Sequence, residues 1–136
     1  MTPAPTDLSN WTPRALAALR IITALLFIGH GTMKLFGFPA GDSPMRAELF
    51  SLMGFAGVLE FFGGVLILVG LFTRPVAFIL AGQMAAAYFM AHAPQSFYPA
   101  LNGGDAAILF CFIFLYLVAA GPGAWSIDSM RARNSG

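Results

Sequence analysis

Four long apolar runs constrain this chain more than any other feature of its sequence. They extend over about residues 13–36, 51–72, 74–92 and 103–121. A hydrocarbon core about 30 Å thick is crossed by roughly 20 helical residues, so each run is long enough to span a membrane. Of the 136 residues 58% are hydrophobic, which is more than a soluble fold of this size can bury. The sequence therefore predicts an all-α protein, a four-transmembrane-helix bundle that forms a single domain over residues 1–136 within the lipid bilayer.

The distribution of Lys and Arg predicts the orientation of the bundle. If the N-terminus is cytoplasmic, five basic residues lie on the inside and two on the outside, as the positive-inside rule favours. The inside set is Arg14, Arg20, Arg74, Arg131 and Arg133, and the outside set is Lys34 and Arg46. The first run lacks a preceding basic n-region and an obvious cleavage site, so we expect it to be retained as a span. We predict an N-in/C-in, multi-pass protein.

Charge and cysteine content exclude several classes of function. A formal net charge of +1 provides no basic field for nucleic acid. The single cysteine, Cys111, lies inside an apolar run, so neither a disulfide framework nor a dithiol pair within the chain is available. The sequence has no CxxC, no dinucleotide-binding glycine motif and no iron–sulfur spacing, and we assign no metal ligands.

Polar residues form one stripe along the first run. Arg20, Thr23, Phe27, His30 and Lys34 follow one another at spacings of 3, 4, 3 and 4, which places them on one helix face. Arg20 and Lys34 lie near the ends of the run, where a long side chain can reach the interface, so we interpret both as interface anchors. His30 lies a turn deeper with a ring too short for this, and it is a candidate catalytic residue. Lys34 is also a candidate ligand-binding residue.

Glu60 is a charged residue that the sequence places deep in the membrane. It follows the apolar start at Ser51 by nine residues, roughly 13 Å along a helix, close to the middle of the membrane. Packing does not explain a carboxyl group there, so we expect it to be protonated, paired with a base or exposed to a polar cavity, and we name it a candidate catalytic residue. The glycines around it let a neighbouring helix approach closely; they are Gly54, Gly57, Gly63, Gly64 and Gly70.

The third and fourth runs add four polar residues. Gln83, near mid-membrane, is most simply a hydrogen-bond donor between helices, and His92 lies at the outer end of its run. Asn102 and Asp105 open the fourth run with the spacing of a capping box. Asp105 is a further candidate catalytic residue, and Gln83, His92 and Asn102 are candidate ligand-binding residues.

Most of these residues map to the outer half of the predicted bundle, with Glu60 below them. The outer set is His30, Lys34, His92, Asn102 and Asp105. Such a cluster predicts a small polar pocket that opens near the outer interface. A pocket of this kind suits an amphipathic molecule such as a quinone, whose ring is held by polar groups while its tail lies in lipid.

Four short motifs, in this order, resemble those of the DoxX family of small bacterial membrane proteins. They are "HGTMKLFG" at 30–37, "EFFGGVLILVGLFTR" at 60–74, "NGGDAA" at 102–107 and "GPGAWSID" at 121–128. The resemblance implies a four-helix protein of the bacterial inner membrane that is an oxidoreductase or a subunit associated with one. Members are linked to sulfur-compound oxidation with quinone as acceptor, to quinone or thiol stress, and to membrane redox complexes. Asp105 stands where the family more commonly has Glu, and the shorter side chain favours the capping role.

The residues and the resemblance together suggest a quinone-linked redox protein. In this hypothesis His30 and Lys34 donate hydrogen bonds to a quinone head group, and Glu60 or Asp105 accepts a proton. A minor variant places a b-type haem between His30 and His92 as its two axial ligands.

Two alternatives from other classes stay open. The chain can be a non-catalytic anchor or assembly subunit of a redox complex, in contact with other subunits or with further copies of itself. A transporter or proton pathway is weaker, because four spans normally need oligomerisation to form one.

Overall fold

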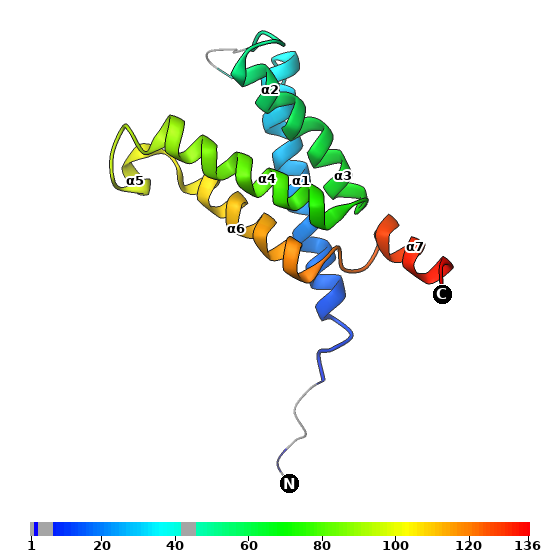
Figure 1. The fold of residues 1–136 in the computed structure, drawn as a ribbon. Coiled ribbons are helices and arrows are strands. Elements are labelled where there is room, and N and C mark those ends of the chain that lie inside the picture. The colour runs from blue at the N-terminus through cyan, green and yellow to red at the C-terminus, as the bar shows by residue number, and fades with distance from the viewer. Residues whose placement is uncertain (1, 3–6, 42–45) are drawn as a thin grey trace.

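Helices make up all the regular structure in the part of the chain that the computed structural model describes, residues 2, 7–41 and 46–136. Figure 1 shows their arrangement. The α-helices and the two π-helical turns, η1 and η2, follow the order α1 (Thr12–Phe36), α2 (Leu52–Val58), η1 (Leu59–Gly63), α3 (Gly64–Val69), α4 (Thr73–Ala87), η2 (Tyr88–His92), α5 (Pro99–Asn102), α6 (Asp105–Ala120) and α7 (Ile127–Asn134).

The predicted apolar runs correspond to four helical segments. Three are long and apolar enough to cross a membrane: α1, the continuous helix Leu52–Val69 and the continuous helix Thr73–His92. The fourth, α6, is a shorter apolar helix of 16 residues. This arrangement confirms the predicted all-α class and is that of a four-helix membrane bundle. The cytoplasmic placement of both termini stays a prediction from the Lys and Arg count.

The helices form two hairpins. In the first hairpin, α1 packs against α2, η1 and α3; in the second, α4, which continues into η2, packs against α6. Figure 1 shows that the hairpins lie close together near the turn between α3 and α4 and diverge toward α2 and α5. The divergence leaves a wedge between them at the end of the bundle that holds Lys34 and His92.

Glycines allow the helices of the first hairpin to approach closely. A Cβ atom at Gly31 would lie 2.6 Å from the backbone nitrogen of Phe61, and one at Gly57 would lie 2.9 Å from the Cβ of Lys34. Contacts this short leave room only for hydrogen. The packing role predicted for the second-run glycines is therefore confirmed at Gly57.

Aromatic rings fill the region where the two hairpins meet. Phe27 of α1 packs against Phe110 and Phe114 of α6, with ring centroids 5.3 and 5.0 Å apart. Phe27 and Phe114 are fully buried, and they join small α4 side chains such as Ala77 in one core. The outward faces carry exposed apolar side chains suited to lipid, among them Leu25, Phe62, Phe78 and Phe112.

Arg20 departs from its predicted role. It does not reach toward an interface but is fully buried, and its guanidinium group donates hydrogen bonds to the backbone carbonyls of Pro122, Ala124 and Trp125. The bond to Ala124 measures 3.0 Å and the bond to Trp125 measures 2.9 Å. A buried charge needs such partners because it has lost its hydration. The interpretation of Arg20 as an anchor was wrong because the distant segment that covers it leaves no pattern in the first run.

Asp128 forms a second set of contacts at the same end of the molecule as Arg20. Its carboxylate accepts hydrogen bonds from the backbone N–H groups of Phe72 and Thr73, at 2.9 and 2.8 Å, at the turn that joins the hairpins. Burial alone would raise the pKa of Asp128. The hydrogen bonds from Thr73 and Phe72 and the positive charge of Arg131 together lower it by more than burial raises it, so the pKa lies below its ordinary value. We call residues 121–128, which bind both Arg20 and this turn, the C-terminal clasp.

Candidate functional site

A buried ion pair joins the two helices of the first hairpin. The Lys34 ammonium group donates to both carboxylate oxygens of Glu60, at 2.6 and 2.7 Å. Glu60 is 2% exposed and the Lys34 side chain 23% exposed. Pairing with a base, one of the three states expected for Glu60, is observed. The interpretation of Lys34 as an interface anchor was therefore wrong, because the buried carboxylate draws the ammonium group inward.

Each hairpin contains one π-helical turn, and each turn carries an ionisable residue of the site. Glu60 lies in η1, and His92 ends η2. A π turn adds a residue to the helix and so rotates the face that the following side chains present, and such turns are frequent at functional sites. No predicted pattern indicated either turn, because the apolar residues around them suit an α-helix equally well.

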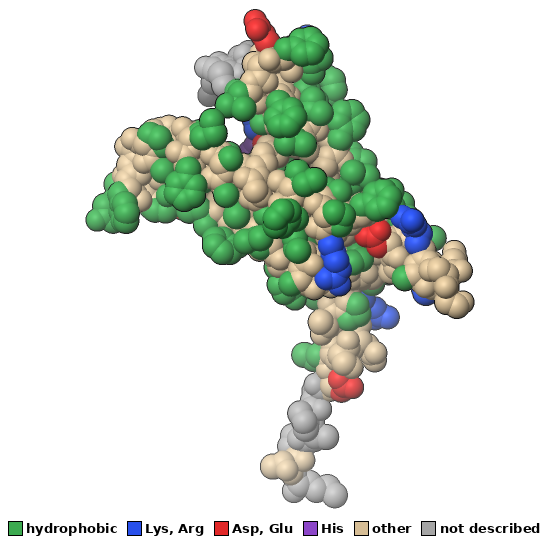
Figure 2. All heavy atoms as spheres, in the orientation of Figure 1, with side chains coloured by type: hydrophobic (Ala, Val, Ile, Leu, Met, Phe, Trp, Pro, Cys, Tyr) green, Lys and Arg blue, Asp and Glu red, His purple; other side chains and the backbone are tan. Residues whose placement is uncertain are grey.

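A cavity of about 280 Å³ lies between the two hairpins, and we call it the inter-hairpin cavity. Figure 2 shows a hollow between the two arms of the molecule, with Lys or Arg, acidic and His side chains inside it. The first hairpin lines the cavity with Phe27, His30, Lys34 and Glu60, and the second lines it with Met84, Ala87, His92, Gly103, Ala106, Ala107 and Phe110.

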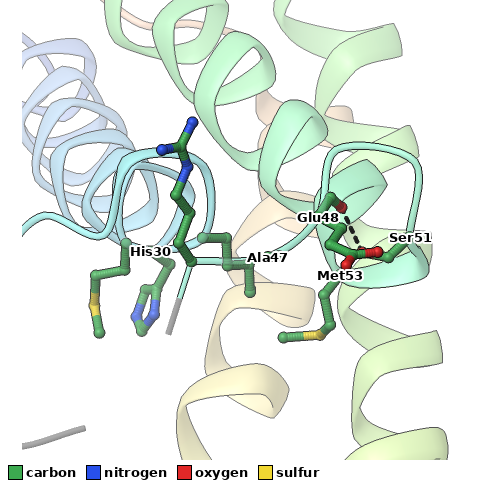
Figure 3. A pocket seen from close by; sticks show the side chains of 8 residues that line it. His30, Ala47, Glu48, Ser51 and Met53 are labelled. Atoms are coloured by element: carbon green, nitrogen blue, oxygen red, sulfur yellow. Dashed lines mark hydrogen bonds between the residues drawn. The ribbon is translucent and has the colours of Figure 1, made fainter. Parts of the chain in front are cut away.

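His30 lies at the opening of this cavity. Its ring packs edge-on against Phe110 with centroids 5.9 Å apart, and it forms no hydrogen bond with any residue that the structure describes. His30 and Lys34 also line a second, outer cavity of about 600 Å³, which lies between α1 and residues 46–53. In Figure 3 the Met53 side chain extends toward the side of that cavity where His30 lies. The two cavities therefore share two basic residues, His30 and Lys34.

His92 is held from behind by the loop that leads into α6. Its Nδ1 lies 3.0 Å from the carbonyl oxygen of Asn102. Asn102 is itself 3% exposed, and its side-chain amide donates to the Ser96 carbonyl at 3.0 Å and to the Tyr88 hydroxyl at 3.3 Å. Its side-chain oxygen accepts from the Gly104 N–H at 2.8 Å. Asn102 supports the cavity wall but does not line it.

The capping box predicted from Asn102 and Asp105 is not formed. Helix α6 begins at Asp105 with Gly104 in the N-cap position, and no side chain caps it. Asn102 belongs instead to the preceding short helix α5, and its oxygen bonds the N–H of Gly104. The two glycines between Asn102 and Asp105 end α5 and place Asp105 in the first turn of α6.

Asp105 and Gln83 also lie away from the cavity. Asp105 is exposed and makes no hydrogen bond with a described residue. Gln83 donates to the Ala56 carbonyl oxygen at 3.4 Å, which is the bond between helices that its position predicted. Of the seven predicted site residues, the structure thus brings four to the cavity: His30, Lys34, Glu60 and His92.

The apolar residues of the cavity wall were not predicted. Phe27 belonged to the polar stripe of the first run, but Met84 and Phe110 gave no signal, since they resemble any other lipid-facing or core residue in an apolar run. Within residues 7–41 and 46–136 no group of three or more His, Cys, Asp or Glu side chains is placed to hold a metal ion.

Comparisons with known proteins follow the same elements. The sequence profile of the DoxX family matches residues 15–93, which cover α1 from its fourth residue onward and all of α2 to η2. An uncharacterized protein of Haemophilus influenzae is 42% identical over 129 residues, covering 90% of this chain and 95% of that protein. The inner membrane protein YqjF of Escherichia coli is 33% identical over 124 residues, 82% of this chain and 87% of that protein. An uncharacterized membrane protein of Mycobacterium tuberculosis is 26% identical over 139 residues, 90% of this chain and 85% of that protein. No solved structure matches the chain.

Proposed function

This chain belongs to the DoxX family, and from that premise we propose that it is a quinone-linked redox protein of the bacterial inner membrane. In this proposal the inter-hairpin cavity binds the head group of a quinone. The protein acts as an oxidoreductase or as a component of a redox complex.

The Lys34–Glu60 ion pair in the cavity wall carries the proposal. A charged pair inside a membrane protein is costly, and such groups usually face a cavity or a pathway where they act on a ligand, an ion or a proton. Here both members line the same cavity, together with His30 and His92. If these residues served only to hold two helices together, apolar side chains of similar volume would stabilise the contact as well as or better than the ion pair does.

The size of the cavity supports a head group with its tail outside. Pockets that enclose a whole drug-sized ligand measure roughly 300–1,000 Å³. The inter-hairpin cavity, at about 280 Å³, lies just below that range. It suits a single substituted ring, whose apolar tail would leave along the wedge between the hairpins. A haem between His30 and His92 is larger than such a ligand, so the cavity does not favour the haem variant.

The cavity residues match the proton chemistry of a quinone. Oxidation of a quinol to a quinone releases two protons and two electrons, and reduction takes them up. His30 and Glu60 are the groups that we propose as proton acceptors, with Lys34 as a hydrogen-bond donor to a ring oxygen. The sequence encodes no electron carrier of its own. We therefore assign the electrons to a partner redox protein that exchanges them with the bound ring.

A second candidate is a non-catalytic subunit of a membrane redox complex. The C-terminal clasp favours it. The motif at 121–128, which resembles that of the family, binds Arg20 and the turn at Phe72. Neither of these residues lines the inter-hairpin cavity. In that case the ion pair would serve only to hold α1 against η1.

The test is to purify the protein in mild detergent and extract bound small molecules for mass spectrometry while recording the visible spectrum. We expect near-stoichiometric quinone with the wild type, and loss of most of it with Glu60→Gln or His30→Ala. Glu48→Gln is the matched control, because it makes the same change at an exposed carboxylate outside the inter-hairpin cavity. Wild-type protein that holds no quinone and binds none when it is added, but co-purifies with redox subunits, would replace this proposal with the second candidate.

A further inference from the structure

The hydrogen bond behind His92 fixes which of its nitrogens can act in the cavity. A carbonyl oxygen only accepts hydrogen bonds, so at 3.0 Å from the Asn102 carbonyl the Nδ1 atom carries the proton. In a neutral imidazole the other nitrogen, Nε2, then has a free lone pair. Nε2 has no partner among the residues that the structure describes. His92 therefore offers the cavity a hydrogen-bond acceptor.

The surroundings of His92 keep the ring in this state. The Asn102 backbone is held by three side-chain hydrogen bonds, to Ser96, Tyr88 and Gly104. The Tyr88 ring stacks on the imidazole with centroids 6.4 Å apart. The hydrogen bond to Asn102 on one side and the stacked ring on the other favour the orientation in which Nδ1 faces the loop, which leaves Nε2 as the nitrogen available to the cavity.

The opposite wall of the cavity offers a donor. The Lys34 ammonium group has three N–H bonds and no acceptor capacity. Two of them are used on the two oxygens of Glu60, which leaves one for a ligand. The inter-hairpin cavity thus has a donor on the first hairpin and an acceptor on the second, with an apolar wall of Phe27, Met84 and Phe110 between them.

From this pairing we infer that the cavity selects the reduced, hydroxyl-bearing form of its ligand, with His92 as the residue that determines the preference. The inference rests on the proposed quinone site. One hydroxyl of a quinol donates to Nε2 of His92, while the oxygen across the ring accepts from Lys34. A quinone satisfies Lys34 alone, because its second carbonyl oxygen faces the lone pair of Nε2 with no proton between them. A buried site that loses such a bond discriminates against the ligand that lacks the hydroxyl.

The test compares a benzoquinol that carries a short alkyl tail with its oxidised quinone. Both are titrated anaerobically against the full-length protein in lipid nanodiscs, and the two dissociation constants are measured from protein fluorescence. We expect the wild type to bind the quinol about tenfold more tightly, the value of one hydrogen bond. His92→Phe keeps a flat ring but no acceptor, and we expect it to bind both forms equally. Met84→Leu is the matched control, because it changes the apolar wall that both forms contact and should leave the ratio of the two dissociation constants unchanged.

A second measurement does not depend on the His92 variant folding. The ring nitrogens of ¹⁵N-labelled histidine report the tautomer directly by NMR, with His30→Phe used to assign His92. We expect the proton on Nδ1. A proton on Nε2, equal binding of the two forms by the wild type, or an unchanged preference in His92→Phe would each overturn the inference and leave the quinone site intact. If neither form bound to the wild type, the quinone site itself would be overturned, and the inference with it.

Discussion

At the scale of single residues, the site depends on a lysine whose side chain binds a carboxylate on the neighbouring helix. Lys34 and Glu60 are 26 positions apart in sequence and lie on neighbouring helices. The sequence predicted both as site residues and gave pairing with a base as one of three alternatives for Glu60. It did not predict the pair, because the positions of polar residues along two helices do not specify which helix faces meet. His30, the stronger candidate from sequence, lines the cavity without bonding Glu60.

Breaking the Lys34–Glu60 pair should destabilise the protein unless both charges are removed. We expect Lys34→Met to lower the free energy of unfolding by about 3 kcal/mol, because it leaves the Glu60 carboxylate buried without a partner. Adding Glu60→Gln to Lys34→Met should restore most of the loss. Thermal unfolding in one detergent measures all three proteins. Arg133→Met, a change at an exposed charge, is the control, and a Lys34→Met protein as stable as this control would contradict the expectation.

At the scale of helices, the apolar runs determined what could be predicted. Each run became one helical segment, and the ends differed by at most three residues, since the last turn of a helix is set by local hydrogen bonds. The π turns at η1 and η2 could not be predicted in the same way. They depend on how a helix fits against its neighbours, and Leu59–Gly63 has no residue that excludes a regular α-helix.

The close contact between α1 and η1 gives a test at this scale. A Cβ at Gly31 would meet the Phe61 backbone at 2.6 Å, whereas one at Gly29 would meet nothing within 4 Å. We expect Gly31→Ala to cost about 1–3 kcal/mol through overpacking against a backbone that must shift. Gly29→Ala should stabilise the helix by roughly 0.5–1 kcal/mol, because alanine loses less freedom than glycine.

Unfolding temperatures of the two glycine variants measure the difference between them. If the two substitutions changed the unfolding temperature equally, the α1–η1 contact would not be the close one that Gly31 requires.

At the scale of the whole molecule, the two hairpins are joined at one end and separate at the other. The turn between them is fixed by Asp128, and the buried Arg20 of the first hairpin is tied to the segment that follows the second. The "GPGAWSID" motif was noticed in the sequence only as part of a family resemblance. Its structural role could not be predicted, because Arg20 and its carbonyl partners are more than 100 residues apart.

The clasp should weaken in acid. The pKa of Asp128 in the folded protein lies below its ordinary value, so its ionised form stabilises the fold at neutral pH. An unfolded aspartate titrates near pH 3.9, so this contribution is complete above about pH 5 and is lost as the pH falls through the lower, folded pKa. We expect Asp128→Asn to be less stable than the wild type by about 1 kcal/mol at pH 7, because a charge-assisted hydrogen bond is about twice as strong as a neutral one.

Unfolding temperatures of the wild type and Asp128→Asn, measured between pH 3 and pH 7, should converge at the acid end. A gap that stays constant over this range would show that the charge of Asp128 does not hold the clasp.

The clasp also has a consequence for the order in which the protein can mature. Arg20 is translated more than 100 residues before the carbonyl groups that it binds, those of Pro122, Ala124 and Trp125. Until those residues are made, the guanidinium group lacks the acceptors that it has in the folded protein. The first hairpin can therefore reach its final contacts at Arg20 only after residues 122–125 have been synthesised and have packed against it. A chain cut short before Gly121 would leave Arg20 without these three partners.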